Sequence, residues 1–542
     1  MHNQVINYHL LNYKIMKLIS LFILFLLLSI STFAQCDGSC LPDGIVFTNQ
    51  YEVDNFPANY PNCTEIEGTL ALYSSLVTNL DSLNVLTSVG ALQIYDNYSL
   101  TDLSGLNNLE HVQILAIIDN PALTSLEGLE NLKTISGNCF IQGNPVLNSL
   151  SGLENLTSIG GMVWINNNDF LSDFEGLNSL QSIGDDFLLW ENHSLTSLNG
   201  LSALDSIYGN FTFTNQISQL NFTGLNSLSY IGGELYLGHL PSLINCEGLE
   251  SLKYIGSDLT LEFDKSLTTL IGMENLQHIG GTLVIKNDST LTDFTGLSAL
   301  ENIEGGISLY NNYSLEGFAG LENLTTTDST IQVNANPALL NFNGLEGLTS
   351  INGNLIIQNN QNLTSLTGLN NLTTLSFSTP GVLAIHDNAS LTSLTGLNNI
   401  NPESINTMSI VNNSVLSTCE VESICGYLAN DEGSFQAYDN ATGCNSREEV
   451  VTACTVSLDQ IQQNSDYSIF PNPASWQITI KPPCEPTDKC YATLCNINGD
   501  ELLRQPVSQQ QTTISIKHLS KGIYILTLTK DNAIHQEKIV KL

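Results

Sequence analysis

Residues 267–290 read LTTLIGMENLQHIGGTLVIKNDST, and this unit sets the pattern for most of the chain. Its first apolar residues recur at every third position, at Leu267, Leu270, Met273, Leu276 and Ile279. A period of three would smear these side chains around an α-helix, so the segment predicts a non-helical arc. After Gly280 the period becomes two, which predicts a short strand with Leu283 and Ile285 facing a core.

The same unit is repeated along the chain. A Gly-Leu or Gly-Met pair returns at ten successive steps of 24 residues between Gly128 and Gly368, and a step of 28 residues then reaches Gly396. A fixed period this short means that each repeat is one coil stacked on similar neighbours. Stacking places the strands in parallel, about 4.8 Å apart. We therefore predict a mainly β solenoid of about fourteen coils over residues 66–416.

Asparagine marks one corner of the coils. It lies three residues after the second core position of the strand, at Asn97, Asn120, Asn144, Asn168, Asn192, Asn312, Asn336, Asn360, Asn388 and Asn413, with Asp264 and Asp288 as substitutes. A short amide there can bond the backbone of its own corner and of a neighbouring coil. Gln216 and Leu240 depart from the pattern, which predicts looser corners in their coils.

The repeat frame resembles the leucine-rich repeat, and its short Gly-Leu flanks resemble the receptor-L-type variant of bacteria. The resemblance implies a leucine-rich-repeat solenoid with an exposed parallel sheet. Extended regular surfaces of this kind usually serve binding rather than turnover.

Residues 1–34 are predicted to be a secretory signal peptide. Two lysines precede the apolar run Leu18–Ile30, which is too short to span a bilayer, and small residues follow it. We expect Met16 to be the true start and cleavage to follow Ala34. No other segment is apolar and long enough to cross a membrane, so the mature chain is expected to have no transmembrane segment.

Cysteines gather at both ends of the repeats, in residues 35–65 and 417–455. The disulfide candidates are Cys36, Cys40, Cys63, Cys419, Cys425, Cys444 and Cys454. Secreted solenoids can cover their end coils with disulfide-pinned caps, and we predict one at each end. The C-terminal four allow three pairings, and the N-terminal three leave one thiol over. A metal site is the alternative for the C-terminal four, but they lack a C-x-x-C motif and a nearby histidine.

Cys139 and Cys246 fall on inward positions of the repeats and are predicted to be buried thiols.

The composition changes near residue 455. Residues 456–466 have the polar, Gln-rich look of a linker, and 467–542 alternate like strands. Four landmarks resemble the type A sorting domain of the Bacteroidetes type IX secretion system; they contain Phe470, Pro471, Asn472, Pro473, Gly499, Gly522, Tyr524 and Lys541. The resemblance implies a small C-terminal β-sandwich read by the type IX secretion machinery. It also implies a protein that is secreted or displayed on the outer cell surface.

Several kinds of chemistry are disfavoured. The chain contains none of the motifs H-E-x-x-H, G-x-S-x-G, G-x-G-x-x-G or the P-loop, and we predict no catalytic residues and no enzyme. The net charge of −38 argues against binding nucleic acid, which requires a basic surface. Acidic corners would attract counter-ions, Ca²⁺ among them, but the EF-hand and nonapeptide calcium motifs are missing, so no cofactor or metal site is predicted.

One stretch of outward strand positions is rich in aromatic residues. The candidate ligand-binding residues are Phe140, Trp164, Leu188, Trp190 and Tyr236. An exposed apolar patch on a secreted protein suggests recognition of a glycan or a protein, with tryptophan and tyrosine as anchors. The alternative is cross-strand packing in a structural surface spacer without a dedicated ligand. A hydrolase with dispersed carboxylates is the third reading.

Overall fold

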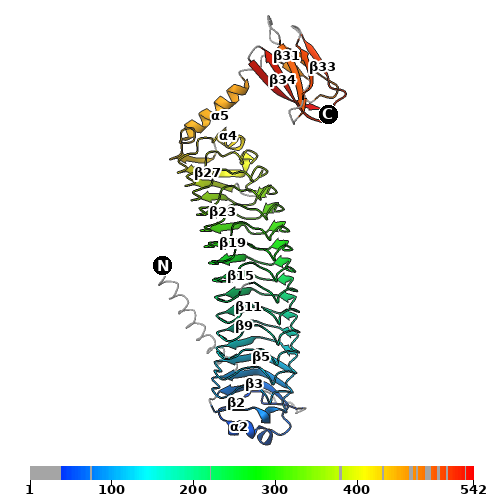
Figure 1. Cartoon of the computed structure of the whole chain (residues 1–542), viewed down its shortest axis with the longest axis vertical. Helices are drawn as coiled ribbons and strands as arrows, with labels where there is room; N and C mark the ends of the chain where they lie inside the picture. Colours follow the sequence, from blue (N-terminus) through cyan, green and yellow to red (C-terminus); the bar gives the residue numbers. More distant parts are fainter. Residues whose placement is uncertain are drawn as a thin grey trace. The chain divides into compact units, whose positions relative to one another are not determined.

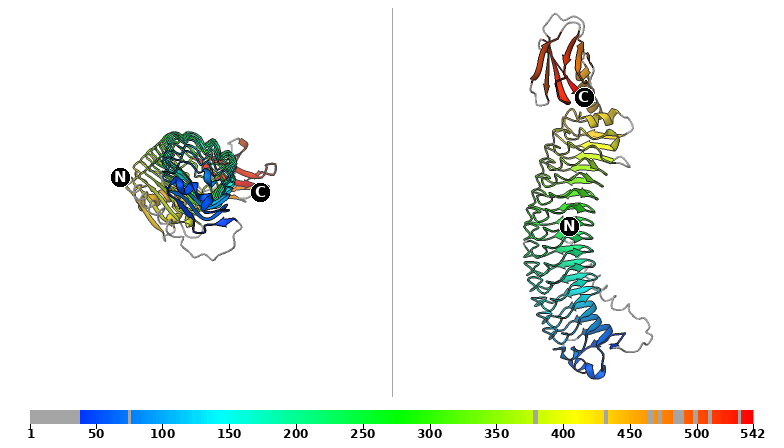
Figure 2. Two further views of the ribbon diagram at one scale, coloured as in Figure 1. Left: turned by 90° about the horizontal axis from the view of Figure 1, so that it is seen from below. Right: turned by 90° about the vertical axis from the view of Figure 1, so that its right-hand side faces the viewer.

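The structure is a computed structural model, shown in Figures 1 and 2, that describes residues 38–73, 76–219, 221–376, 381–429, 433–462, 468–470, 474–481, 490–496, 501–507, 511–530 and 533–541. The chain divides into two compact units between Ser446 and Arg447. The first unit is the predicted solenoid, and Figure 2 shows its coils as a gently curved stack. The predicted signal peptide and Cys36 lie outside the described residues.

The N-terminal cap covers the first coil. It comprises β1 (Ser39–Cys40), β2 (Ile45–Phe47), α2 (Gln50–Asp54) and α3 (Phe56–Asn59). Phe47, Val53 and Phe56 are at most 2 % exposed and close the end of the core. A disulfide between Cys40 and Cys63 pins the cap, with the two Cα atoms 5.6 Å apart. Because an end coil would otherwise expose apolar side chains, this cap fulfils the predicted need.

Long parallel strands begin the solenoid and then divide. β3 (Glu65–Tyr73), β4 (Ser88–Tyr95) and β5 (His111–Ile118) pair side by side, and η1 (Asp81–Leu83) lies between the first two. β5 pairs with two strands of the next coil, β6 and β7. From there to β25 each coil carries a two-residue and a four-residue strand, so this part of the solenoid has two ladders.

The short ladder contains β6 (Thr134–Ile135), β8 (Ser158–Ile159), β10 (Ser182–Ile183), β12 (Ser206–Ile207), β14 (Tyr230–Ile231), β16 (Tyr254–Ile255), β18 (His278–Ile279), β20 (Asn302–Ile303), β22 (Thr326–Thr327) and β24 (Ser350–Ile351). The long ladder contains β7 (Cys139–Gln142), β9 (Val163–Asn166), β11 (Phe187–Trp190), β13 (Phe211–Thr214), β15 (Leu235–Gly238), β17 (Leu259–Glu262), β19 (Leu283–Lys286), β21 (Ile307–Tyr310), β23 (Ile331–Asn334), β25 (Leu355–Gln358), β26 (Gly381–His386), β27 (Ile405–Val411) and β28 (Ser434–Tyr438). All of these pairings are parallel, and from β7 to β25 residues 24 apart are partners. The predicted solenoid of 24-residue coils is confirmed.

The inward positions form one continuous core. Leu267, Leu270 and Met273 in the arc and Leu283 and Ile285 in the strand are all 0 % exposed, as the two periods predicted. Cys139 and Cys246 are free, buried thiols in the same core, at 2 % and 0 % exposure. Burying one such side chain contributes about 1.5–3 kcal/mol, so stacked coils stabilise one another.

The repeated glycine follows from close packing of neighbouring coils. Gly320 has a φ of +101°, a conformation that L-residues rarely adopt. A Cβ atom there would collide with the backbone carbonyl of Phe294 in the preceding coil. Glycine is therefore needed at this point of the arc for its conformation and for its lack of a side chain.

The asparagine corner forms a buried hydrogen-bond ladder. Asn120 Nδ2 donates to the carbonyls of Ile94 at 2.9 Å and Ile118 at 3.1 Å, and Asn144 Oδ1 accepts the Asn120 N–H at 3.1 Å. Asp119, directly before it, has a φ of +57°, and a residue with positive φ precedes the corner in each coil from Asn97 to Asn440. The ladder thus satisfies backbone groups that this left-handed turn removes from the strand pairing.

The ladder is interrupted in the middle of the solenoid. Gln216 departs only in part from the ladder, because its Oε1 accepts the Asn192 N–H at 3.1 Å but its Nε2 is buried and makes no hydrogen bond within the protein. Leu240 is the true break, because it has no side-chain oxygen, although its own N–H donates to Asp264 Oδ1 at 2.9 Å. Asp264 Oδ2 and Asp288 Oδ2 are buried and make no hydrogen bond within the protein.

The C-terminal cap of the solenoid contains η2 (Pro402–Ser404) and α4 (Glu422–Ala429). A disulfide joins Cys419 and Cys444, and Cys425 and Cys454 are also disulfide-bonded. The four C-terminal candidates are therefore cystines rather than ligands of a metal. None of the described helices is both long and apolar enough to span a membrane.

The second unit begins with α5 (Arg447–Gln462), which runs through most of the stretch 456–466 expected to be a linker. Two antiparallel sheets follow: β29 (Ser468–Phe470), β30 (Gln477–Lys481) and β33 (Thr512–Ser515), then β32 (Glu501–Pro506), β31 (Cys490–Asn496), β34 (Gly522–Lys530) and β35 (Ala533–Lys541). Ile478, Ile480 and Ile514 of one sheet share a core with Leu494 and Leu526 of the other. This is the predicted small β-sandwich.

Candidate ligand-binding face

The long ladder presents two rows of outward side chains. We call them the first row, with Phe140, Trp164, Leu188, Thr212 and Tyr236, and the second row, with Gln142, Asn166, Trp190, Thr214 and Gly238. Alternation along each strand turns these residues away from the core. All five candidate residues lie in the first or second row and are partly buried.

Four of the five candidates form one group, here called the aromatic cluster: Phe140, Trp164, Leu188 and Trp190. The Phe140 and Trp164 ring centroids lie 6.3 Å apart at an interplanar angle of 72°, and those of Trp164 and Trp190 lie 5.0 Å apart at 67°. These edge-to-face contacts are favourable aromatic geometries. We expected both tryptophans to lie exposed, but both are partly buried. Trp164 and Trp190 are diagonal neighbours on adjacent strands, so their rings touch and each shields part of the other.

Tyr236 lies apart from the aromatic cluster. It pairs with Thr212, which in turn pairs with Leu188, so a threonine separates it from the cluster. Its ring packs against Gly238, and its hydroxyl donates to Glu262 Oε2 at 3.3 Å. Burial, together with the nearby Glu262 carboxylate, raises the pKa of the Tyr236 hydroxyl. Glu262 also pairs with Lys286 at 2.8 Å, so Tyr236 borders a charged region.

Two polar atoms beside the aromatic cluster have no partner in the protein. Trp164 Nε1 and Asn166 Oδ1 are both buried and make no hydrogen bond within the chain. Asn166 as a whole is only 6 % exposed. The two residues lie two positions apart on β9, so their side chains share one face of the sheet. Leaving a buried polar group unpaired costs about 1–3 kcal/mol, which a ligand offering hydrogen bonds could recover.

The two outward rows around the cluster contain no charged residue. From β3 to β15 the outward residues are Ala71, Tyr73, Gln93, Tyr95, Ala116, Ile118, Phe140, Gln142, Trp164, Asn166, Leu188, Trp190, Thr212, Thr214, Tyr236 and Gly238. We call these positions the uncharged strip. The next strands, β17 and β19, introduce Glu262 and Lys286. An uncharged strip of this length is unexpected on a chain whose net charge is −38.

A second aromatic group, on the short ladder, was not identified from the sequence. The rings of Tyr230 and Tyr254 stack 5.1 Å apart at 5°, and those of Tyr254 and His278 stack 4.7 Å apart at 8°. Their common signal is a ring directly before the repeated isoleucine at 24-residue spacing. Because these rings use their faces on one another, they offer less stacking surface to a ligand than the aromatic cluster does.

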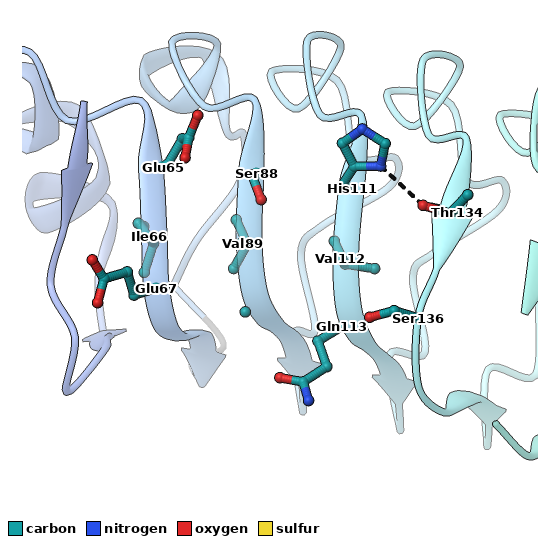
Figure 3. Close-up of a pocket in the computed structure, with 11 residues that line it drawn as sticks. Glu65, Ile66, Glu67, Ser88, Val89, His111, Val112, Gln113, Thr134 and Ser136 are labelled. Atoms are coloured by element: carbon teal, nitrogen blue, oxygen red, sulfur yellow. Dashed lines mark hydrogen bonds between the residues drawn. The ribbon is translucent and has the colours of Figure 1, made fainter. Parts of the chain in front are cut away.

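A polar depression of about 390 Å³ lies near the N-terminal cap. Figure 3 shows Glu65, Ser88, His111 and Thr134 in one row across β3 to β6, with a hydrogen bond of 2.9 Å between His111 Nδ1 and Thr134 Oγ1. Gly90 leaves part of its wall without a side chain. Among the described residues, no three or more His, Cys, Asp and Glu side chains are grouped to hold a metal ion.

The structure also brings together described parts of the sorting signal. Gly522 at the start of β34 pairs with Lys541 of β35, and Tyr524, two residues on, is 8 % exposed. The Tyr524 hydroxyl donates to the Ser520 carbonyl at 2.8 Å and fixes the entry to β34. Phe470, in β29, is 48 % exposed. Pro471, Asn472, Pro473 and Gly499 lie outside the described residues.

Comparison with known families assigns this sandwich a role in export. Residues 468–542 match the model of the family described as the secretion system C-terminal sorting domain. The match confirms the predicted type IX sorting domain and indicates a protein that is exported to the outer surface or secreted. A search of curated proteins finds no match to the chain.

Proposed function

We propose that this chain is a non-enzymatic recognition or adhesion protein, secreted or surface-displayed, that binds an extracellular glycan or protein through its strand face. The observation that carries the proposal is the aromatic cluster with two unpartnered polar atoms beside it. Tryptophan anchors on a rigid sheet lose little conformational entropy on binding. The resemblance of the repeat frame to receptor-L-type leucine-rich repeats supports the same role.

The proposed route to the surface has two steps. Residues 1–34 act as the signal peptide that carries the chain to the periplasm. The sorting domain then engages the type IX secretion machinery, its first partner, and the chain crosses the outer membrane. The support for the second step is the family match together with the packed sandwich around Ile478 and Leu526.

Deleting residues 468–542 is expected to leave the protein in the periplasm, because the sorting signal is lost while the solenoid and its cystines remain. Cell fractionation followed by immunoblotting against the solenoid measures the distribution. Trp476→Ala is the matched control, since Trp476 lies in the same domain, is 68 % exposed and can be removed without touching its core. Surface or medium localisation of the truncated chain would show that another segment directs export.

Two other functions compete with recognition. A structural surface spacer needs only the stacked coils and would bind no specific partner. A hydrolase would need recessed acids, and the acids that line the depression, Glu65 and Glu67, are both exposed. Glycan and protein arrays probed with the full chain separate these possibilities. Selective binding that requires the aromatic cluster supports recognition, whereas a chain that binds nothing supports the spacer.

A further inference from the structure

We propose that the uncharged strip binds a neutral polysaccharide, whose chain runs along the solenoid axis and crosses the parallel strands. This inference rests on the proposed recognition function and names the chemical class of the ligand. Three features support it: the strip has no charged residues, β9 has two unpartnered polar atoms, and the strip is long.

The charges select against ionic ligands. No basic side chain lies in the uncharged strip to pair with an anionic polymer, and the chain as a whole, at −38, repels one. No carboxylate lies in the strip to pair with a cationic peptide either. The acids of this region, such as Asp186, Glu191 and Glu234, lie just beyond the ends of the strands. Glu234 reaches past the strip, where its Oε1 accepts the Thr260 hydroxyl of β17 at 2.6 Å. The two rows of the strip thus offer no charged partner to an ionic ligand, and this favours a neutral one.

The polar atoms fit hydroxyl groups. Trp164 Nε1–H needs an acceptor and Asn166 Oδ1 needs a donor, and a sugar hydroxyl can serve as either. Gln142, Thr212 and Thr214 add an amide and two hydroxyls in neighbouring strands. Trp164 Nε1 and Asn166 Oδ1 are both buried, so a side chain must shift before a ligand can reach them. Trp190 of β11 pairs with Asn166 of β9 and its ring lies 5.0 Å from that of Trp164, so we infer that Trp190 is the side chain that shifts.

The length of the strip fits a polymer rather than a single sugar. It crosses eight strands, from β3 to β15, and strands about 4.8 Å apart make it about 34 Å long. Six aromatic rings lie along it, at Tyr73, Tyr95, Phe140, Trp164, Trp190 and Tyr236. Apolar ring surfaces can stack against the C–H faces of successive sugars. Binding is therefore expected to strengthen as the oligosaccharide lengthens.

The test is affinity electrophoresis of the full chain in gels containing a starch-type glucan, a mixed-linkage β-glucan or a mannan. Polygalacturonate and poly-lysine serve as the anionic and cationic probes. At least one neutral polymer is expected to retard the parent chain. Trp164→Ala is expected to weaken that binding about 30-fold or more, as for a central anchor. Tyr310→Ala is the matched control, because Tyr310 is an outward aromatic residue, 45 % exposed, beyond the strip on β21.

A second variant keeps the test independent of the folding of Trp164→Ala. Thr214→Glu keeps every ring and adds a longer, hydrated side chain beside Trp190, which obstructs a polymer lying along the strip, so it is also expected to weaken binding. Tryptophan fluorescence of the parent chain is expected to change on addition of the neutral polymer, because the polymer would change the surroundings of Trp164 and Trp190.

Each outcome decides between the two proposals. Neutral binding that both variants weaken and that Tyr310→Ala leaves unchanged supports the inference. Retention of neutral binding in both variants, or binding to polygalacturonate or poly-lysine alone, overturns it. If instead a protein from the array binds and Trp164→Ala abolishes that binding, recognition stands and the polysaccharide is wrong. No binding in either assay overturns both proposals.

Discussion

Alanine at position 320 is expected to destabilise the solenoid by about 3 kcal/mol or more, whereas alanine at position 317 in the same coil is expected to be neutral or mildly stabilising. Gly320 has a φ of +101°, and its added Cβ would collide with the Phe294 carbonyl. Because that obstacle is backbone, no side-chain rotation relieves it. Gly317 is not among the residues with positive φ, and the nearest atom to an added Cβ, the Asn343 carbonyl oxygen, lies 3.6 Å away.

Thermal melting followed by circular dichroism measures the global effect of the two substitutions. Hydrogen exchange locates it, because stacked coils need not unfold as a single unit. Loss of protection is expected in the coils that contain Phe294 and Gly320, and only in the Gly320→Ala variant. Equal melting temperatures for the two variants would show that the coils can separate without cost and that the glycine is not needed for packing.

Asparagine at position 264 is expected to stabilise the protein by about 4 kcal/mol near neutral pH. Asp264 is 0 % exposed, and its Oδ2 has no partner in the protein. At an ordinary rung, Asn312 Nδ2 donates to the Ile285 carbonyl at 2.8 Å. An ionised carboxylate has no hydrogen to donate to such a carbonyl. Burial also strips the carboxylate of water, which raises the pKa of Asp264 from 3.8 to about 8, and the nearby Asp288 charge adds to the rise.

The sign of the pH dependence follows from this shift. The folded state holds the proton more tightly than the unfolded state, so the contribution to stability is complete below about pH 4. It is lost as the pH rises through about 8. The parent chain is thus expected to melt at lower temperature as the pH rises across this range, while Asp264→Asn flattens the profile. The two proteins should converge at acidic pH.

The control for this profile lies in the same coil. Asp258 Oδ1 accepts the Thr282 N–H at 2.7 Å, and Asp258→Asn preserves that acceptor. Because Asp258 is only partly buried, this substitution is expected to lack the gain in melting temperature near neutral pH that Asp264→Asn gives. If Asp264→Asn were less stable than the parent at every pH, the carboxyl would not be standing in for an asparagine rung.

The sequence predicts the core more completely than the corners. The periods of three and two placed Leu270 and Ile285 inward, and both are fully buried. The division into two ladders was not predicted, because His278–Ile279 becomes a strand only through pairing with neighbouring coils. Gln216 was taken as a departure from the asparagine ladder, yet its longer side chain still reaches the Asn192 N–H. Residue type alone does not reveal that reach.

The candidate site was only partly predictable for a similar reason. Strand alternation correctly turned Trp164 and Trp190 outward. How far one ring shields the other depends on side-chain orientation, which a repeat pattern does not contain. The Tyr230 and Tyr254 stack was missed because these residues lie in a segment that was interpreted as an arc rather than as a strand. The uncharged strip emerges once the strand registers align its rows.

The register of the ladders has a consequence for how such a chain can change its length. Partners from β7 to β25 are 24 residues apart, and each coil presents the same backbone to the next. Gain or loss of one whole coil therefore returns every glycine, strand and corner to an equivalent neighbour. Gain or loss of a single residue within a strand would exchange inward and outward side chains. The solenoid can thus be lengthened or shortened by genetic duplication or deletion in steps of one coil, with both caps and the sorting domain left intact.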